Sequence, residues 1–134
     1  MKRAKKETRQ EPGPTPAELE ILEILWERGP LTVRAVNDAL NKRDQGGQYT
    51  STLKLMQIMY KKGLLVRDER EMTHVYSAAA AEKKVKRLML DHFLKVIYKG
   101  YTSKLIIELL GNKKTSKSEL KEIKDYLKKM DGAG

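Results

Sequence analysis

The chain has 134 residues and a formal charge of +10, enough for one ordinary domain or for two small domains that share an interface. It contains no cysteine, which excludes disulfides, thiolate metal sites and cysteine nucleophiles, and no apolar run approaches the ~18–20 residues that span a bilayer. Residues 1–6 are basic with no hydrophobic stretch behind them, so no secretory signal is predicted and a soluble cytoplasmic protein with a polyanionic partner is expected.

The N-terminal segment predicts a basic arm followed by a helix. Residues 1–14 are polar and end in Pro-Gly-Pro, which is typical of a flexible arm; contact with phosphates and no role at all are both compatible with it. Thr15, proline at the first helical position and Glu18 form the pattern of a capping box. Gly29-Pro30 ends the helix. Its apolar residues recur at helical spacing: Leu19, Ile21, Leu22, Ile24, Leu25 and Trp26.

Two further helices are predicted before residue 63. Leu31 fits a very short strand, and Thr32 is a suitable N-cap for a helix that fades near Asn41. After a loop over residues 42–47, another helix runs to residue 62, and Gly63 stands where a left-handed C-cap is wanted. The residues expected to face inward are Val33, Val36 and Leu40 in the first of these helices, and Thr52, Leu55, Met56 and Met59 in the second.

A β-hairpin is predicted after Gly63, because the apolar period shifts there from 3.6 towards 2. Leu65 and Arg67 lead to a polar tip at residues 68–71, and residues 73–77 return, with Tyr76 directed inward. Three helices followed by such a hairpin predict a winged helix-turn-helix over residues 15–78.

The remaining residues, 79–134, contain only helical patterns. Three amphipathic helices are expected, the first ending near Gly100, the second near Gly111 and the third capped by Ser116 or Ser118. They have too little material to cover one another's apolar faces, so a homodimer is predicted, with a helical dimerisation domain. Its interface is assigned to Leu88, Phe93, Ile97, Leu105, Leu109, Ile123 and Leu127.

The third helix carries the predicted nucleic-acid contacts. No acidic residue occurs between Asp44 and Asp68, although elsewhere acids are scattered among the bases. Side chains near the start of a recognition helix reach base edges, and its N-terminus favours a phosphate. Tyr49 is assigned either to DNA contact or to packing beneath the helix, and the wing-tip Arg70 either to a phosphate or to a solvated turn. The full set of predicted DNA-binding residues is Tyr49, Thr50, Ser51, Lys54, Gln57, Lys61 and Arg70, with Lys62 also expected near the backbone.

No catalytic or metal constellation is present in the sequence. His74 falls in the wing and His92 in a helix, each without a partner at ligand or triad spacing. Glu18, Glu20 and Glu23 are expected on a solvated helix face and show no paired arrangement of carboxylates for catalysis. An enzyme is therefore not expected, and neither a cofactor nor a metal is predicted.

The order of these motifs resembles the penicillinase-repressor family, the BlaI/MecI/CopY group of bacterial transcriptional repressors. The similar segments are residues 20–26 (Glu-Ile-Leu-Glu-Ile-Leu-Trp), Leu55 with Met59, residues 60–67 (Tyr-Lys-Lys-Gly-Leu-Leu-Val-Arg) and Val75-Tyr76. The resemblance covers about residues 15–130. It implies a homodimer that binds an operator dyad in double-stranded DNA, often with TACA and TGTA elements, and it places Ser51 and Lys54 at base or phosphate contacts.

Three departures from the family pattern limit what the resemblance implies. Ile58 stands where many relatives have an arginine, which predicts a different operator preference. The cysteine-rich site of copper-responsive members is missing. A regulatory protease cuts antibiotic-responsive members at an Asn-Phe bond, whereas the corresponding bond here is approximately Glu108–Leu109, in a helix expected to be buried. The regulatory protease or effector is therefore not identified.

Two alternatives to a plain operator-binding repressor remain open at the level of sequence. The winged helix is also compatible with a protein-interaction module whose basic C-terminal helices bind polyanions without sequence preference. Residues 79–134 hold 14 basic and 7 acidic residues, net +7, against 14 and 11, net +3, in residues 1–78. The other alternative is a repressor with an effector pocket at the dimer interface.

Overall fold

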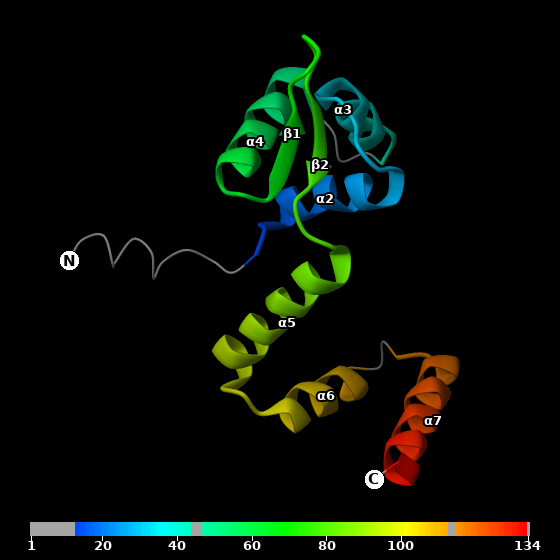
Figure 1. The fold of residues 1–134 in the computed structure, drawn as a ribbon. Helices are drawn as coiled ribbons and strands as arrows, with labels where there is room; N and C mark the ends of the chain where they lie inside the picture. Colours follow the sequence, from blue (N-terminus) through cyan, green and yellow to red (C-terminus); the bar gives the residue numbers. More distant parts are fainter. Residues whose placement is uncertain (1–12, 44–46, 113–114, 134) are drawn as a thin grey trace, which may run out of the picture. The chain divides into compact units, whose positions relative to one another are not determined.

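The computed structural model describes residues 13–43, 47–112 and 115–133, and shows a mainly helical chain with one small antiparallel sheet (Figure 1). In chain order the elements are α2 (Pro16–Arg28), α3 (Val33–Lys42), α4 (Tyr49–Lys61), β1 (Leu65–Asp68), β2 (Val75–Ala78), α5 (Glu82–Tyr98), α6 (Thr102–Gly111) and α7 (Lys117–Ala133). This order confirms the predicted fold class. In the described ranges, none of the helices combines the length and apolarity needed to cross a membrane. The basic arm and part of the 42–47 loop fall outside the described residues.

Local capping determines where the helices begin. The Thr15 hydroxyl accepts from the Glu18 backbone N–H at 3.3 Å, and the Thr15 N–H donates to the Glu18 carboxylate at 3.0 Å, which completes the predicted capping box. Thr32 caps α3 by accepting from the Ala35 N–H. At α7 the hydroxyl of Ser116, rather than that of Ser118, accepts from the Glu119 N–H.

The end of α4 leads directly into the wing. Gly63 has φ of +85°. The Leu64 N–H donates to the Met59 carbonyl at 2.9 Å, and the Gly63 N–H donates to the Tyr60 carbonyl at 3.1 Å, which are the two hydrogen bonds of a Schellman motif. The chain then enters β1, which pairs antiparallel with β2 from Leu65 opposite Ala78 to Asp68 opposite Val75. Leu31 adds a short bridge to Tyr76 on the other side of β2, so the predicted single-residue strand is confirmed.

The core of the winged helix lies between α2, α3, α4 and the hairpin. Its most deeply buried side chains are Ile21, Leu22, Ile24, Val36, Met56 and Met59. Tyr76 is also buried, as predicted, whereas Leu55 and Trp26 are only partly covered and pack on the core from its margin. These contacts fix the orientation of α4 relative to the other helices and therefore decide which of its side chains reach the surface.

The chain divides into two compact units, residues 1–90 and 91–134, a division that falls inside α5 and not at residue 78. The reason is that the start of α5 is tied to the winged helix. The Trp26 indole N–H donates to the Ala80 carbonyl at 2.9 Å, Val85 is buried, and Lys86 pairs with Glu23 at 3.6 Å.

The C-terminal helices form at the predicted places but bury little. α6 has no buried residue. Five of the predicted dimerisation side chains are between 45% and 56% exposed in the single chain: Leu88, Phe93, Ile97, Leu109 and Leu127. Leu105 and Ile123 are half-buried. The expectation that Glu108–Leu109 lies in a buried helix is therefore wrong for the single chain, because both side chains are exposed.

Candidate nucleic-acid interface

The outer face of α4 presents the predicted contact residues together. Thr50, Ser51, Lys54, Gln57 and Lys61 are all exposed, on the side of the helix away from the buried Met56 and Met59. Ile58 shares this face and is 42% exposed. The face carries hydroxyl, amide and ammonium groups and no carboxylate, which suits base edges and phosphates.

A buried polar contact holds the start of α4 in place. The Asn37 side-chain amide donates to the Thr52 hydroxyl at 2.7 Å and to the Gly47 carbonyl at 3.2 Å. Asn37 is 5% exposed and Thr52 is likewise buried, so little water competes for these bonds. These two bonds link α3 to the residue that precedes α4 and to the first turn of α4, and thereby fix the position of that turn.

An ion pair holds the other end of α4. The Lys62 ammonium lies 2.8 Å and 2.9 Å from the two carboxylate oxygens of Glu18, whose side chain is 3% exposed. The prediction that Glu18 lies on a solvated face is therefore wrong, since this buried carboxylate serves both the α2 cap and the α4 terminus. The Lys62 side chain is paired but 44% exposed, so a phosphate would compete with Glu18 for it, and its contact with the DNA backbone stays a prediction.

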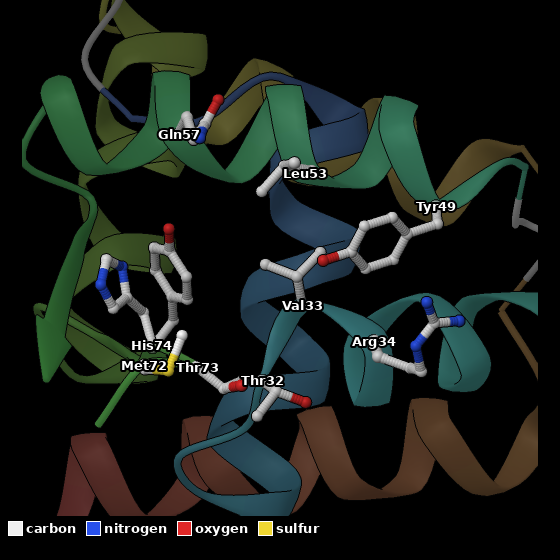
Figure 2. A pocket seen from close by; sticks show the side chains of 10 residues that line it. Thr32, Val33, Arg34, Tyr49, Leu53, Gln57, Met72, Thr73 and His74 are labelled. Carbon is white, nitrogen blue, oxygen red and sulfur yellow. The ribbon is translucent and has the colours of Figure 1, made fainter. Parts of the chain in front are cut away.

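A hollow of about 350 Å³ lies between α3, α4 and the wing (Figure 2). Tyr49 and Leu53 of α4 line one side, Arg34 and Thr32 line another, and His74 lies on the wing side. The Arg34 guanidinium lies 4.5 Å from the centre of the Tyr49 ring. The ring of Tyr49 also packs on the core, and its hydroxyl is directed towards Val33. Packing of Tyr49 is thus observed, while its contact with DNA stays a prediction.

The tip of the wing carries a compact ion pair. Arg70 donates to both carboxylate oxygens of Asp68, with the shortest contact at 2.7 Å, and its backbone N–H donates to the same carboxylate at 3.0 Å. These bonds lower the pKa of Asp68 to about 2. The Arg70 side chain is 87% exposed but already paired, so a phosphate would have to compete with Asp68 for it.

The base of the wing is fixed to α4 by Arg67. Its guanidinium stacks 3.9 Å from the centre of the Tyr60 ring and pairs with Glu69 at 2.6 Å. The stacking joins β1 to the side of α4. The wing and α4 therefore present one connected surface.

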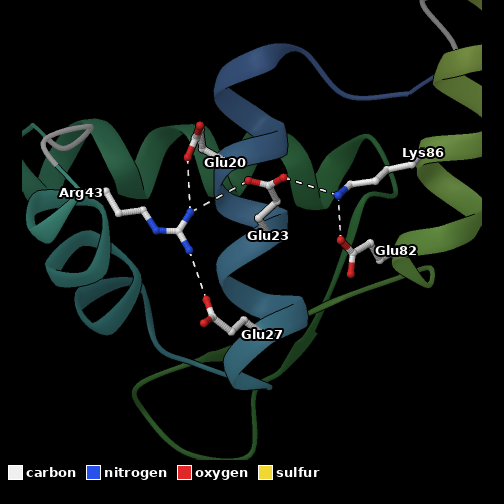
Figure 3. A network of polar contacts seen from close by, with 6 residues as sticks. All are labelled: Glu20, Glu23, Glu27, Arg43, Glu82 and Lys86. Carbon is white, nitrogen blue, oxygen red and sulfur yellow. Dashed lines mark hydrogen bonds and ion pairs between the residues drawn. The ribbon is translucent and has the colours of Figure 1, made fainter. Parts of the chain in front are cut away.

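The acidic face of α2 is neutralised by two cations (Figure 3). Arg43 pairs with Glu20 at 3.4 Å and with Glu27 at 3.2 Å, and it also approaches Glu23. Lys86 bridges Glu23 and Glu82. Glu20 and Glu23, expected on a solvated face, thus form ion pairs with cations that come from residues distant in the sequence.

Asn37 and Arg34 are the residues of this surface that sequence patterns did not single out. Asn37 directly follows Val36 on the apolar stripe of α3. A polar side chain at such an inward position is the sequence feature that could have identified it. Arg34 sits in the first turn of α3, and only the packing of α3 against α4 places it beside Tyr49. The described residues contain no group of three or more His, Asp or Glu side chains suited to a metal ion.

A three-helix core, a hairpin wing and an exposed third helix without acids define a winged-helix DNA-binding regulator. The chain belongs to the penicillinase repressor family, whose model matches residues 14–129. Membership in this family makes it a DNA-binding transcriptional repressor and not an enzyme, as predicted.

Individual relatives are distant but cover most of the chain. The methicillin resistance regulatory protein MecI of Mammaliicoccus sciuri is 24% identical over 84% of this chain and 91% of its own length. The penicillinase repressor of Bacillus licheniformis is 24% identical over 83% and 86%. Among solved structures, the transcriptional regulator Tm0710 of Thermotoga maritima matches with a TM-score of 0.48 and 21% identity, over 89% of this chain and 74% of that one.

Proposed function

We propose that this protein acts in the cytoplasm as a homodimer that binds an operator dyad and silences the adjacent promoter. The observation that carries the proposal is the outer face of α4, which is exposed and free of acids, and whose helix is anchored by a buried hydrogen bond at its start and by a partly buried ion pair at its end. Such anchoring pre-organises the contact residues, so less ordering is required when DNA binds.

The proposed homodimer follows from the apolar faces of α5, α6 and α7. Phe93, Ile97, Leu109 and Leu127 are each about half exposed, far more than the side chains that form the core of the winged helix. A second copy offers the same faces in a self-complementary arrangement with two-fold symmetry. Two α4 helices related by that symmetry would reach half-sites about one helical turn, or a multiple of it, apart.

The roles proposed on α4 follow from position. Thr50, Ser51 and Lys54 lie at the N-terminal half, where side chains reach base edges, and Gln57 lies one turn further on. Lys61 lies at the far end, in reach of a phosphate.

We further infer that the hollow beside α4 receives the backbone of one strand. Arg34 is exposed at its edge, and neutralisation of one phosphate by this guanidinium would contribute about 0.9 to the slope of log affinity against log salt. Replacing Arg34 with alanine should therefore lower affinity for all duplexes alike and reduce the salt slope by about one. An unchanged slope would show that Arg34 makes no phosphate contact.

Selection from random duplex DNA at about 150 mM salt tests the function. An enriched dyad is expected. A pool that stays random, with retention lost as salt rises, would instead support the non-specific polyanion-binding module, which the net charge of +7 in residues 79–134 favours.

Lys54 provides the sharpest test of the α4 surface. Lys54→Ala should weaken binding to the selected dyad by about 1–3 kcal/mol and relax its preference at one position. Arg28→Ala removes the same charge from the exposed last turn of α2 and is the matched control, for which little loss is expected. Equal losses in the two variants would contradict a base contact by Lys54.

A further inference from the structure

Ile58 is a large apolar side chain exposed among polar ones. It is 42% exposed, whereas the large apolar residues of α2, α3 and the rest of α4 are buried or partly buried. Ser51, Lys54 and Lys61 are exposed on the same side of the helix, whereas Leu55, one turn earlier, is partly buried against the core. A polar residue at position 58 would serve solubility better.

The position of Ile58 is that of a side chain that reads bases. Ser51, Lys54 and Ile58 are spaced at i, i+3 and i+7, which places them along one face over two helical turns. A helix lying in the major groove presents such a set to successive base pairs. A buried hydrogen bond holds the start of α4 and a partly buried ion pair holds its end, so rotation of this helix to hide Ile58 is opposed.

The major groove contains one apolar group that an isoleucine can contact, the C5-methyl of thymine. Burial of that methyl against Ile58 removes apolar surface from water on both sides. We propose that Ile58 recognises a thymine methyl group in each half-site and so contributes to operator specificity. This inference rests on the proposed function, because it requires α4 to lie in the major groove.

Protein docking is a weaker explanation for the exposure of Ile58. The exposed Lys54 and Lys61 lie one turn before and after Ile58, whereas protein interfaces are built around larger apolar centres with few charges. A cationic border around one apolar group instead matches a groove lined by phosphates, in which a methyl group projects from the floor.

The experiment replaces thymine with deoxyuridine, which removes only the methyl group. Each thymine of the selected dyad is replaced in turn, symmetrically in both half-sites, and affinity is measured by fluorescence anisotropy for the wild type and for Ile58→Ala. One position should weaken wild-type binding by about fourfold per half-site, the value expected for one buried methyl-sized group. Ile58→Ala should lose this sensitivity while keeping the wild-type circular dichroism spectrum.

Two further measurements separate a direct contact from a general loss of affinity. Lys61→Ala should weaken binding to all duplexes and leave the thymine-to-uracil ratio unchanged. A cytosine at the sensitive position should bind more tightly when it carries a 5-methyl group, and this gain should disappear in Ile58→Ala.

The outcomes distinguish this inference from the proposed function. A dyad that is selected but insensitive to every uracil substitution, or a sensitivity that persists in Ile58→Ala, overturns the role of Ile58 and leaves the repressor assignment intact. Failure to select any dyad overturns the proposed function, and the role of Ile58 with it.

Discussion

The two regions of this chain hold their apolar residues differently. In the winged helix, Ile21, Ile24, Val36, Met56 and Met59 are completely buried within one chain. In α6 no residue is buried, and Ile107 is 67% exposed, although α6 has a more apolar composition than α2 of the winged helix. Helical periodicity is present in both regions, but among the described residues the apolar faces are deeply buried only in the first.

This difference indicates two routes to stability. The winged helix is a self-sufficient unit, because helices from one chain enclose its core. The C-terminal helices are shorter than or close to the length at which isolated helices become marginal in water, so their stability depends on packing. We therefore expect the winged helix to tolerate loss of the partner and the C-terminal helices not to.

The largest effect is expected from a cavity in the N-terminal core. Ile21→Ala should lower the free energy of unfolding by about 2–5 kcal/mol, because a fully buried side chain is truncated. Urea unfolding followed by fluorescence of Trp26, the sole tryptophan, measures this. Ile58→Ala makes the same chemical change at an exposed site and should alter stability by about 0.5 kcal/mol or less. Similar effects of the two would mean that the core is not where the structure places it.

The next largest effect is expected from a substitution that disrupts only the proposed dimer face of the C-terminal helices. Leu127→Asp places a carboxylate on the proposed dimer face and should yield monomers in sedimentation, with operator affinity lowered by about 10²–10⁴-fold through lost bivalency. The Trp26 unfolding transition should persist. Ser118→Asp adds the same charge to an exposed position of α7 and should remain dimeric. A wild-type protein that sediments as a monomer at micromolar concentration would contradict the proposed interface.

A smaller effect is expected from the buried polar contact that positions α4. Asn37→Leu leaves the Thr52 hydroxyl and the Gly47 carbonyl without their shared donor, which should destabilise the winged helix by about 1–3 kcal/mol. Asn41→Leu, at an exposed site one turn later, removes only a long bond of 3.5 Å to the Asn37 side-chain carbonyl and should have less effect. Wild-type stability in Asn37→Leu would show that packing alone orients α4.

The smallest effect concerns the wing tip. Because the pKa of Asp68 is lowered to about 2, its pairing with Arg70 is complete above the ordinary carboxyl pKa of 3.8 and is lost as the pH falls through about 2. Titration of the Asp68 carboxyl by NMR should show this midpoint. Asp68→Asn frees Arg70 and should steepen the salt dependence of operator binding by about one. A midpoint near 3.8 would mean that the pair is absent in solution.

The sequence by itself determined the elements and their ends, because these depend on neighbours three or four residues away. Thr15 with Glu18, Thr32, Gly63 and Ser116 cap helices where their types and spacing predict it. The shift of period after Gly63 likewise located the hairpin, and the absence of acids around α4 identified the face that the structure exposes.

Only the tertiary structure decided which charges are paired and which face is anchored. Glu18 with Lys62 are 44 residues apart, and Arg43 with Glu20 are 23 apart, so no local pattern could reveal these pairs. For the same reason, the hydrogen bonds of Asn37 to Gly47 and Thr52 depend on the packing of α3 against α4 and could not be predicted from local sequence. Local periodicity records which faces are apolar, whereas the packing of elements decides which of those faces find a neighbour in the same chain.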